Sequence, residues 1–314
     1  MAIRLFIDGA AGTTGLEIRE RLAGRDEFAL ILLDDSQRKD ETARRDALHA
    51  ADIAILCLPD EAAKEAVRLA QGSGTRIIDA SSAHRVAEGW TYGFPELIGR
   101  ETIAAAQFVS NPGCYPTGFL GLVAPLVRAG LLPADWPYTV NAVSGYSGGG
   151  NTLIERFESD PDIAFRAYGL SMGHKHLPEM RKFAGLAHPP VFSPAVVPAF
   201  RGMLVDVPLP LAAIPGAGRV GKMRECLAEF AANGPLVTFA EAGSTEELLH
   251  RDEGSADDTM SLHLYANADE TQVRLIARLD NLGKGASGAA IQNLNIMCGL
   301  PETTGLRLRA SGSA

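Results

Sequence analysis

Short apolar runs alternate with longer segments of mixed polarity over the first third of the chain. Four runs, at residues 3–7, 29–33, 52–58 and 76–79, are rich in aliphatic and β-branched side chains and have the length of buried strands. The segments between them have helical composition. This alternation predicts an α/β domain of the Rossmann type, a doubly wound parallel sheet with helices on both faces.

The pattern changes after about residue 116. An apolar run of helical length comes first, and strands are predicted at residues 139–143, 196–198, 203–207, 237–239, 261–266 and 272–279. The last of these alternates apolar and polar positions, as a strand with one buried face does. With an amphipathic stretch at residues 220–230, these elements predict an α+β domain built on an antiparallel or mixed sheet.

Length, charge and cysteine usage narrow the class of protein. At 314 residues and 46% hydrophobic content, the chain can form about two domains. The net charge of −9 leaves no basic stripe for nucleic acid, and the four cysteines lie too far apart for a disulfide framework or a structural zinc site. No apolar run approaches the roughly 20 residues that span a bilayer, and no signal peptide precedes the first strand. We therefore expect a cytoplasmic protein that binds neither nucleic acid nor membrane.

A glycine-rich turn follows the first predicted strand. Its spacing, GxxGxxG, is a variant of the dinucleotide-binding fingerprint. Such a turn lets the backbone approach a pyrophosphate, which then lies at the N-terminus of the following helix. The predicted cofactor contacts here are Gly9, Ala11, Gly12, Thr13, Thr14 and Gly15.

The end of the second predicted strand bears on the choice between NAD and NADP. Asp34 and Asp35 are acidic residues of the kind that bind a ribose 2′-hydroxyl, but Ser36, Arg38 and Lys39 follow at once. A hydroxyl and two cations suit a 2′-phosphate. These residues are compatible with either NAD or NADP, and we favour NADP(H).

One cysteine lies in an unusual setting. Residues 110–118 read SNPGCYPTG, which sets Cys114 on a tight turn just before an apolar helix. A helix N-terminus favours thiolate over thiol, and the thiolate is the nucleophile. Asn111 lies close enough to donate its amide to an oxyanion, and Gly113 allows close approach of the backbone. The alternative is a buried free cysteine at a loop-to-helix junction.

Two further blocks carry polar groups suited to a site. A glycine-rich loop at residues 144–150 contains Ser147 and Gly148 and could hold an anion on its backbone amides. Further on, His174, Lys175, His176 and Glu179 lie within six positions. A histidine of this group could act as acid and base with Glu179 to orient it. A zinc site is less favoured, because Lys175 would place a cation beside the metal.

These blocks together resemble those of the aspartate-semialdehyde dehydrogenase superfamily, and within it the short bacterial N-acetyl-γ-glutamyl-phosphate reductase family. The similar blocks span nearly the whole chain, at residues 9–15, 79–85 (DASSAHR), 92–97 (YGFPEL), 110–118, 144–150, 174–179 and 284–293 (KGASGAAIQN). The chain departs from the longer relatives at Lys175, where they carry arginine. It also departs at Ala83 and His84, where they have an acid and an aromatic residue.

The resemblance implies an activity and a set of roles. The implied reaction is the NADPH-dependent reduction of N-acetyl-γ-glutamyl phosphate to N-acetylglutamate 5-semialdehyde and phosphate in arginine biosynthesis, through a thioester on Cys114. His176 would transfer the proton, with His174 as the second choice, and the Cys114 amide and Asn111 would hold the oxyanion. Substrate contacts would come from Ser81, Arg85, His174 and Lys175. Further cofactor contacts would come from Ser147, Gly148, Asn281, Gly285 and Gln292.

The resemblance also implies an organisation. Residues 1–115 would form the dinucleotide-binding domain, to which a C-terminal helix within residues 283–314 returns. Residues 116–282 would form the catalytic and dimerisation domain, and the protein would be a homodimer or homotetramer.

Other functions remain open at this point. A related reductase would act on aspartyl phosphate or an aminoadipyl derivative with the same thiol chemistry. A metal-dependent hydrolase would use His174, His176 and Glu179, and a non-catalytic NADP-binding regulator would not need Cys114. Neither of these last two accounts for the SNPGCYPTG turn.

Overall fold

The chain forms two compact units in the computed structural model, which describes residues 2–34, 36–240, 247–249 and 256–308. The first unit comprises Met1–Gly113 and Ala286–Leu306, and the second comprises Cys114–Gly285 and Arg307–Ala314. The expected boundary after residue 115 therefore lies two residues beyond the observed division.

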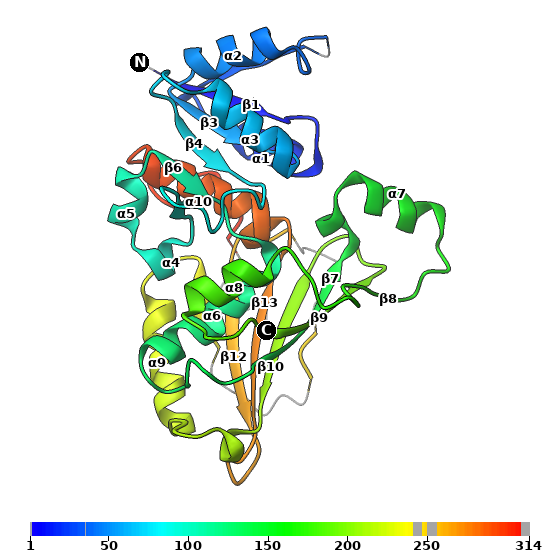
Figure 1. The fold of residues 1–314 in the computed structure, drawn as a ribbon, viewed down its shortest axis with the longest axis vertical. Helices are drawn as coiled ribbons and strands as arrows, with labels where there is room; N and C mark the ends of the chain where they lie inside the picture. The colour runs from blue at the N-terminus through cyan, green and yellow to red at the C-terminus, as the bar shows by residue number, and fades with distance from the viewer. Residues whose placement is uncertain (1, 35, 241–246, 250–255, 309–314) are drawn as a thin grey trace. The chain divides into compact units, whose positions relative to one another are not determined.

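The first unit is built on a six-stranded sheet in which every neighbouring pair is parallel. The strand order is β2-β1-β3-β4-β6-β5, so the order reverses at β1. Strands β1, β3, β4 and β6 of this sheet are labelled in Figure 1. In open α/β sheets, ligands bind at such a reversal, outside the carboxyl ends of the strands. The strands are β1 (Ile3–Asp8), β2 (Phe28–Ile31), β3 (Ile53–Leu56), β4 (Arg76–Asp79), β5 (Thr91–Tyr92) and β6 (Phe108–Ser110).

Helices cover both faces of this sheet, because successive strand residues point to opposite sides. Leu5 and Ile7 of β1 lie in one apolar cluster, and Phe6 between them lies in the other. The first cluster includes residues of α1, α5 and α10, and the second includes residues of α2 and α3. The helices of this unit are α1 (Thr13–Leu22), α2 (Glu41–Ala50), α3 (Asp60–Leu69), α4 (Pro95–Ile98), α5 (Arg100–Ala105) and α10 (Gly288–Met297).

Helix α10 belongs to the first unit although it lies near the end of the chain. Ala290, Ile291 and Leu294 are fully buried in the same cluster as Ile18 of α1. The segment expected to return, residues 283–314, is longer than the one that does. Residues 283–285 belong to the second unit, as does Arg307, whose carbonyl accepts from the Asp258 amide. Residues 309–314 lie outside the described part of the chain.

The second unit is built on a seven-stranded mixed sheet in the order β11-β12-β13-β10-β7-β9-β8. The pairs β11–β12 and β7–β9 are parallel and the other four are antiparallel. Its strands are β7 (Thr139–Gly145), β8 (Arg166–Ala167), β9 (Val191–Val197), β10 (Met203–Leu209), β11 (Val237–Phe239), β12 (Met260–Ala266) and β13 (Val273–Leu279). The fold class predicted from the sequence, a parallel Rossmann-type sheet followed by a mixed sheet, is confirmed.

Helix α6 (Cys114–Arg128) packs closely on one face of the mixed sheet, together with α9 (Val220–Ala232). The close approach depends on glycine: a Cβ at Gly118 would lie 2.7 Å from Val205 Cγ2 and 3.3 Å from Ala277 Cβ. The remaining helices of this unit are α7 (Asn151–Ser159) and α8 (Leu177–Ala184). The sheet therefore holds α6, and with it Cys114, in a fixed position.

Candidate active site

The glycine turn between β1 and α1 has the geometry that its spacing predicts. Gly9 has φ +89°, and a Cβ there would lie 2.2 Å from the Cys57 carbonyl oxygen. A Cβ at Gly15 would lie 2.4 Å from the Gly9 carbonyl oxygen, whereas one at Gly12 would meet only that oxygen at 3.6 Å. Gly9 and Gly15 thus make the tight turn and the helix packing possible. Gly12 leaves room for a ligand to approach the N-terminus of α1.

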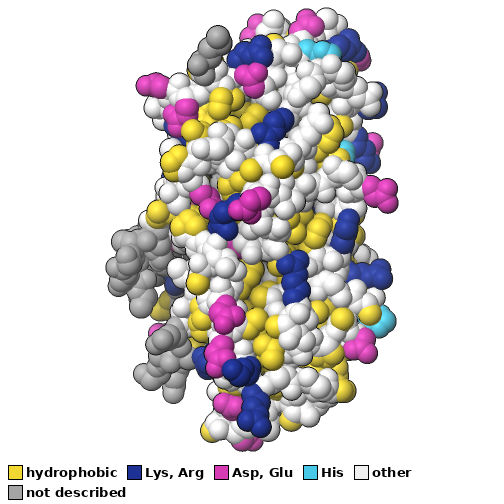
Figure 2. Space-filling model, turned by 90° about the vertical axis from the view of Figure 1, so that its left-hand side faces the viewer, with side chains coloured by type: hydrophobic (Ala, Val, Ile, Leu, Met, Phe, Trp, Pro, Cys, Tyr) yellow, Lys and Arg dark blue, Asp and Glu magenta, His cyan; other side chains and the backbone are white. Residues whose placement is uncertain are grey.

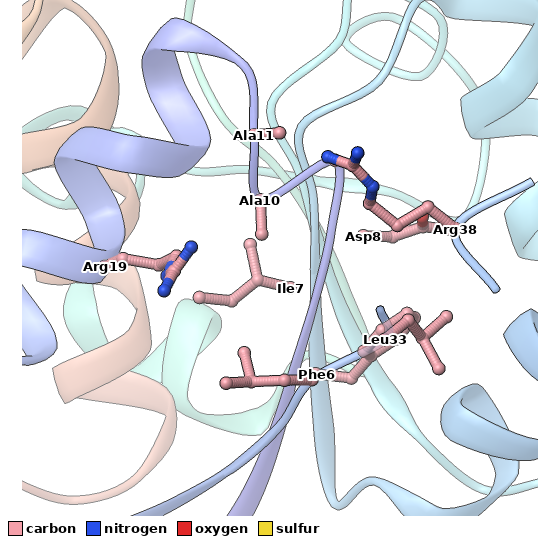
Figure 3. A pocket seen from close by; sticks show the side chains of 10 residues that line it. Phe6, Ile7, Asp8, Ala10, Ala11, Arg19, Leu33 and Arg38 are labelled. Atoms are coloured by element: carbon pink, nitrogen blue, oxygen red, sulfur yellow. The ribbon is translucent and has the colours of Figure 1, made fainter. Parts of the chain in front are cut away.

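A pocket lies beside this turn, within the first unit. Gly9, Ala10 and Ala11 line it, together with Leu32 and Leu33 after β2. Two guanidinium groups also line it, from Arg19 on α1 and Arg38 beyond β2 (Figure 3). A pocket with an apolar wall, backbone donors and two cations suits an adenosine that carries a phosphate.

The three residues predicted to bind a 2′-phosphate have different surroundings. Arg38 lines the pocket. Ser36 donates its hydroxyl to Asp34 Oδ1 at 2.6 Å, and Lys39 is exposed outside the pocket lining. Sequence reasoning missed Arg19, because a basic residue in the second turn of a helix carries no distinctive signal.

Asp8, at the end of β1, places an unusual charge in the lining. The Nε and Nη2 atoms of Arg44 donate to Asp8 Oδ2 at 3.1 and 2.9 Å, and both side chains are buried. Burial raises the pKa of the Asp8 carboxyl, and Arg44 opposes the shift. Arg44 thus compensates a negative charge that would otherwise face an anionic ligand.

Cys114 is the first residue of α6, where the helix dipole favours a thiolate. Gly285, from a distant segment of the same unit, packs closely against Cys114. A Cβ at Gly285 would lie 2.9 Å from Cys114 Cβ and 3.1 Å from the Asp280 carbonyl oxygen. Gly285, which is predicted as a cofactor contact, therefore makes room for the cysteine in this structure.

Aromatic and imidazole rings cluster beside the start of α6. The ring centroids of His174 and His176 are 4.7 Å apart, and the Tyr115 centroid lies 5.9 Å from that of His176. The His176 amide donates to His174 Nδ1 at 3.2 Å, so a neutral His174 carries its hydrogen on Nε2. His176 is buried directly before α8, and Glu179 is buried in the first turn of that helix. Lys175, between the two histidines, is exposed.

Tyr168 is a neighbour of this cluster that sequence reasoning missed. Its hydroxyl donates to that of Tyr115 at 3.3 Å, and its ring lies 5.6 Å from that of His174. Burial raises the pKa of Tyr168 to about 12, and the negative charge of the Cys114 thiolate adds to the shift. Tyr168 is therefore a neutral phenol near the thiol at neutral pH.

Three predicted cofactor residues of the second unit lie together. Asn281 Nδ2 donates to Ser147 Oγ at 2.9 Å, and the Gly202 amide donates to Asn281 Oδ1 at 2.8 Å. A Cβ at Gly148 would lie 3.3 Å from Asn281 Nδ2. These contacts join the glycine-rich loop to the segment after β13 and make it part of the folded unit.

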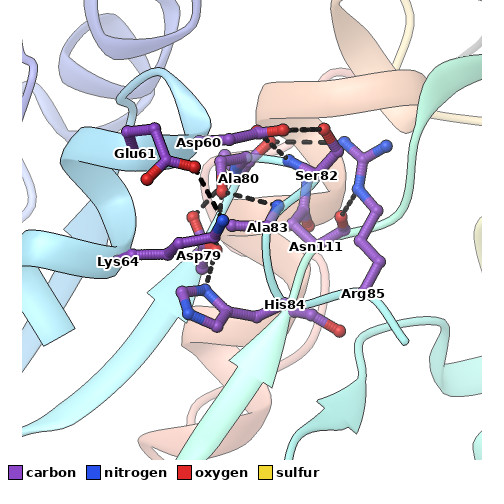
Figure 4. A network of polar contacts seen from close by, with 12 residues as sticks. Asp60, Glu61, Lys64, Asp79, Ala80, Ser82, Ala83, His84, Arg85 and Asn111 are labelled. Atoms are coloured by element: carbon purple, nitrogen blue, oxygen red, sulfur yellow. Dashed lines mark hydrogen bonds and ion pairs between the residues drawn. The ribbon is translucent and has the colours of Figure 1, made fainter. Parts of the chain in front are cut away.

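Three other predicted site residues are engaged within the first unit. Ser81 donates its hydroxyl to Asp79 Oδ2 at 2.7 Å, and Arg85 Nε donates to the Asn111 carbonyl at 3.0 Å (Figure 4). Asn111 uses one amide hydrogen on the Ala286 carbonyl at 2.9 Å, which leaves the second for an oxyanion.

Gln292 has a structural position. It is fully buried, and its Nε2 donates to Glu96 at 3.0 Å and to Glu302 at 2.6 Å. Both amide hydrogens of Gln292 thus bind neighbouring carboxylates, so its side chain stabilises α10 and is not a proposed cofactor contact.

Two kinds of site find no support among the described residues. The described part of the chain contains no group of three or more histidine, cysteine and acidic side chains able to hold a metal ion. None of its helices has the length and apolar character needed to cross a membrane. On the face drawn in Figure 2, acidic and basic side chains are interspersed rather than gathered by sign.

Comparison with protein families shows which class of protein this fold and site define. Residues 4–106 match the NAD binding domain of semialdehyde dehydrogenases, and residues 114–281 match the dimerisation domain of the same enzymes. Solved structures agree in fold. Aspartate semialdehyde dehydrogenase II of Vibrio cholerae, complexed with ASA, has a TM-score of 0.70 at 17% identity and covers 95% of this chain and 98% of its own. The enzyme of Candida albicans, with NADP, has a TM-score of 0.67 at 16% identity over 95% and 99% of the two chains.

Full-length relatives narrow the class further. The N-acetyl-gamma-glutamyl-phosphate reductase of Trichormus variabilis is 49% identical over 96% of this chain and 99% of its own length. That of Brucella ovis is 49% identical over 95% and 100%, and that of Burkholderia ambifaria is 47% identical over 94% and 96%. The chain belongs to the N-acetyl-γ-glutamyl-phosphate reductase family, within the semialdehyde dehydrogenases. The family predicted from the sequence is confirmed.

Proposed function

We propose that the protein reduces N-acetyl-γ-glutamyl phosphate to N-acetylglutamate 5-semialdehyde and inorganic phosphate in arginine biosynthesis, with NADPH as reductant. Relatives that carry this name are 47–49% identical over nearly the full length of both chains. The observation that carries the chemistry is Cys114 at the N-terminus of a rigidly packed helix, directly before Tyr115, whose ring lies 5.9 Å from that of His176 and 6.2 Å from that of His174.

Cys114 is the nucleophile in this proposal. Its thiolate attacks the γ-carbonyl carbon, the carbon–sulfur bond forms, and the bond to the phosphate oxygen breaks, which leaves a thioester and free phosphate. NADPH supplies a hydride when bound. Addition of hydride and a proton to the thioester gives a hemithioacetal, whose collapse releases the aldehyde and restores the thiolate. The Cys114 amide and Asn111 stabilise the oxyanion, and one such donor is worth about 3 kcal/mol.

In this proposal, His176 donates the proton that is added to the thioester together with the hydride. It is buried beside Tyr115, the residue that follows the nucleophile, and directly precedes a helix whose first turn contains Glu179. Glu179 orients the imidazole. His174 has its Nδ1 committed as an acceptor and can offer Nε2–H to the substrate.

The glycine turn and the pocket beside it fit NADP(H). Gly12 and the first amides of α1 would hold the pyrophosphate, and Arg38 with Arg19 would hold the adenosine and its 2′-phosphate. In the second unit, Ser147, Gly148 and Asn281 are the proposed further contacts. These residues bind and orient the cofactor and take no part in proton transfer.

The substrate carries negative charge at two ends. Lys175 is exposed beside His174 and is the proposed counter-charge for the carboxylate. Arg85 and Ser81 are the proposed contacts on the phosphate side. Each of them also donates hydrogen bonds within the first unit, so the Ser81 hydroxyl and the Arg85 guanidinium would bind the anion and the protein at the same time.

We further propose that the protein is a cytoplasmic homodimer that associates through the mixed sheet. The matched family domain is described as a dimerisation domain. On β13, Ala277 faces α6, so Ile276 and Arg278 point to the opposite face. Val143 and Val191 expose apolar side chains on neighbouring strands. Sedimentation at micromolar concentration would test this state.

The decisive assay is phosphate-dependent reduction of NADP⁺ with N-acetylglutamate 5-semialdehyde, comparing the wild type with Cys114→Ser and with aspartate semialdehyde as a second substrate. We expect activity with the acetylated aldehyde alone, abolished by the substitution. Turnover of aspartate semialdehyde would assign the chain to a related reductase instead. Retention of activity in Cys114→Ser, or its loss on addition of a chelator, would overturn the thiol mechanism.

A further inference from the structure

A hydrogen-bonded pair at the end of β4, Asp79 and His84, has no role in the reaction described so far. Asp79 is fully buried, and its carboxylate accepts three hydrogen bonds. They come from the Ser81 amide at 2.9 Å, the Ser81 hydroxyl at 2.7 Å and His84 Nδ1 at 2.6 Å. Because a buried carboxylate without donors is costly, these bonds hold segment 79–84 in one conformation.

His84 is held in two ways. An ionised carboxylate only accepts, so Nδ1 of His84 carries the hydrogen in the bond to Asp79. The imidazole also stacks on the Trp90 ring, with centroids 4.2 Å apart and planes 12° from parallel. Any flat ring could stack there, but the hydrogen bond to Asp79 requires a donor.

The same segment holds the turn that leads to the nucleophile. The Asn111 amide donates to the Asp79 carbonyl at 2.7 Å, and Arg85 Nε donates to the Asn111 carbonyl at 3.0 Å. Both backbone groups of Asn111 are thus bound by the two ends of segment 79–85, as Figure 4 shows for the Arg85 side chain. Arg85 Nη2 also donates to the Ala80 carbonyl, at 3.3 Å.

We propose that His84 is a positioning residue for the reductase reaction. By its bond to Asp79 it places the backbone of Arg85, and Arg85 places the carbonyl of Asn111. Pro112 follows Asn111 in the chain. Because the φ angle of Pro112 is fixed, a displacement of the Asn111 carbonyl also displaces the backbone that leads to Cys114. This inference rests on the proposed function only in taking Cys114 as the nucleophile.

Two substitutions at His84 separate its ring from its hydrogen-bond donor. In His84→Phe the ring can still stack on Trp90, but Asp79 loses a donor. In His84→Asn the amide nitrogen can occupy the place of Nδ1, but the ring is lost. The bonds of Ser82 to Asp60, at 2.7 to 2.9 Å, remain in both variants and hold the other side of the loop.

The measurements are kcat, KM for phosphate, and the rate of Cys114 alkylation by iodoacetamide between pH 6 and pH 9. In His84→Phe we expect kcat to fall between about 10-fold and about 100-fold, the cost of a small misplacement of reacting groups. The alkylation profile of Cys114 should shift as well. His84→Asn should keep kcat within about 3-fold of the wild type, because the donor alone carries the effect.

His49→Phe is the matched control. His49 is a surface histidine of the same unit whose Nε2 lies 3.0 Å from the Leu69 carbonyl, and its loss should change neither kcat nor alkylation. If His84→Phe does not fold, Ser81→Ala removes a different donor from Asp79 and should shift the alkylation profile of Cys114 in the same direction, a readout that needs no bound substrate.

Several outcomes would overturn the proposal. They are equal kcat values in His84→Phe and wild type, an equal loss in His84→Asn and His84→Phe, or an unchanged alkylation profile in His84→Phe. If the wild type fails to turn over the acetylated aldehyde, the proposed function fails. The alkylation profiles of the two variants would still decide the role of His84.

Discussion

Cys114 differs from the other three cysteines in its surroundings. Burial raises the pKa of Cys57 to about 12 and that of Cys298 to about 11, and it also raises the pKa of Cys226. Cys114 begins a helix, where the dipole stabilises a negative charge. These contrasts assign the reactive thiol on physical grounds that do not depend on the family.

We therefore predict that iodoacetamide at pH 8 labels Cys114 before any other cysteine. The thiolate is the reactive form, and burial raises the pKa of the thiols of Cys57, Cys226 and Cys298. Peptide mass spectrometry at increasing times gives the order of labelling. Faster labelling of Cys57 or Cys298 would contradict the assignment.

Gly285 is a residue where a single methyl group should disturb the nucleophile. In Gly285→Ala the new Cβ would lie 2.9 Å from Cys114 Cβ, so one of the two backbones must shift. We expect kcat to fall by at least about 10-fold, since small misplacements of reacting groups are costly.

Gly221→Ala is the matched control for this change. Its Cβ would meet no atom within 4 Å in the first turn of α9, where alanine is a better helix former than glycine. Activity should be unchanged and the thermal midpoint slightly raised. Full activity in Gly285→Ala would show that the close contact does not position Cys114.

At the scale of single elements, the turn from β1 to α1 and the segment beyond β2 together form a cofactor pocket. Arg38→Ala removes one of its two guanidinium groups. A charge-assisted hydrogen bond contributes about 1.5 to 3 kcal/mol, so Kd for NADP⁺ should rise between about 10-fold and about 100-fold. Kd for NAD⁺ should hardly change, because NAD⁺ lacks the 2′-phosphate.

Isothermal titration with each nucleotide measures both constants. Arg45→Ala is the control, since Arg45 lies half-buried on α2, and ion pairs between neighbouring turns of a helix, such as that of Arg45 with Glu41, contribute little to stability. Equal weakening of NADP⁺ and NAD⁺ binding by Arg38→Ala would show that Arg38 does not contact the 2′-phosphate.

The sequence predicted the positions of many elements closely, but it did not predict which partners the side chains contact. The apolar runs predicted β4 at Arg76–Asp79 and β11 at Val237–Phe239 with the bounds observed. β2 ends at Ile31 rather than residue 33, where its pairing with β1 ends, and β9 spans Val191–Val197 rather than residues 196–198. Arg19 and Tyr168 were missed because their neighbours come from other elements, which periodicity alone does not bring together.

At the scale of the whole molecule, the core of the first unit includes a helix from the far end of the chain. Leu294→Ala removes a fully buried side chain from the cluster shared by α1 and α10. Such deletions cost about 2 to 5 kcal/mol. We expect the free energy of unfolding to fall by this amount, as measured by urea denaturation of the full chain.

Leu16→Ala on α1 is the control, because Leu16 is 47% exposed and its loss leaves no cavity. It should change the free energy of unfolding by less than about 1 kcal/mol. Equal effects of the two substitutions would mean that α10 does not stabilise the first unit.

The return of α10 has a consequence for how the protein is made. The first unit requires Ala286–Leu306, which leave the ribosome only after Cys114–Gly285 of the second unit have been synthesised. Until then, the sheet face later covered by Ala290, Ile291 and Leu294 is an apolar surface without its partner helix. The segment Met1–Gly113 therefore completes its fold only late in synthesis, although it is made first. Until then, the nascent chain is open to aggregation or chaperone binding at that face.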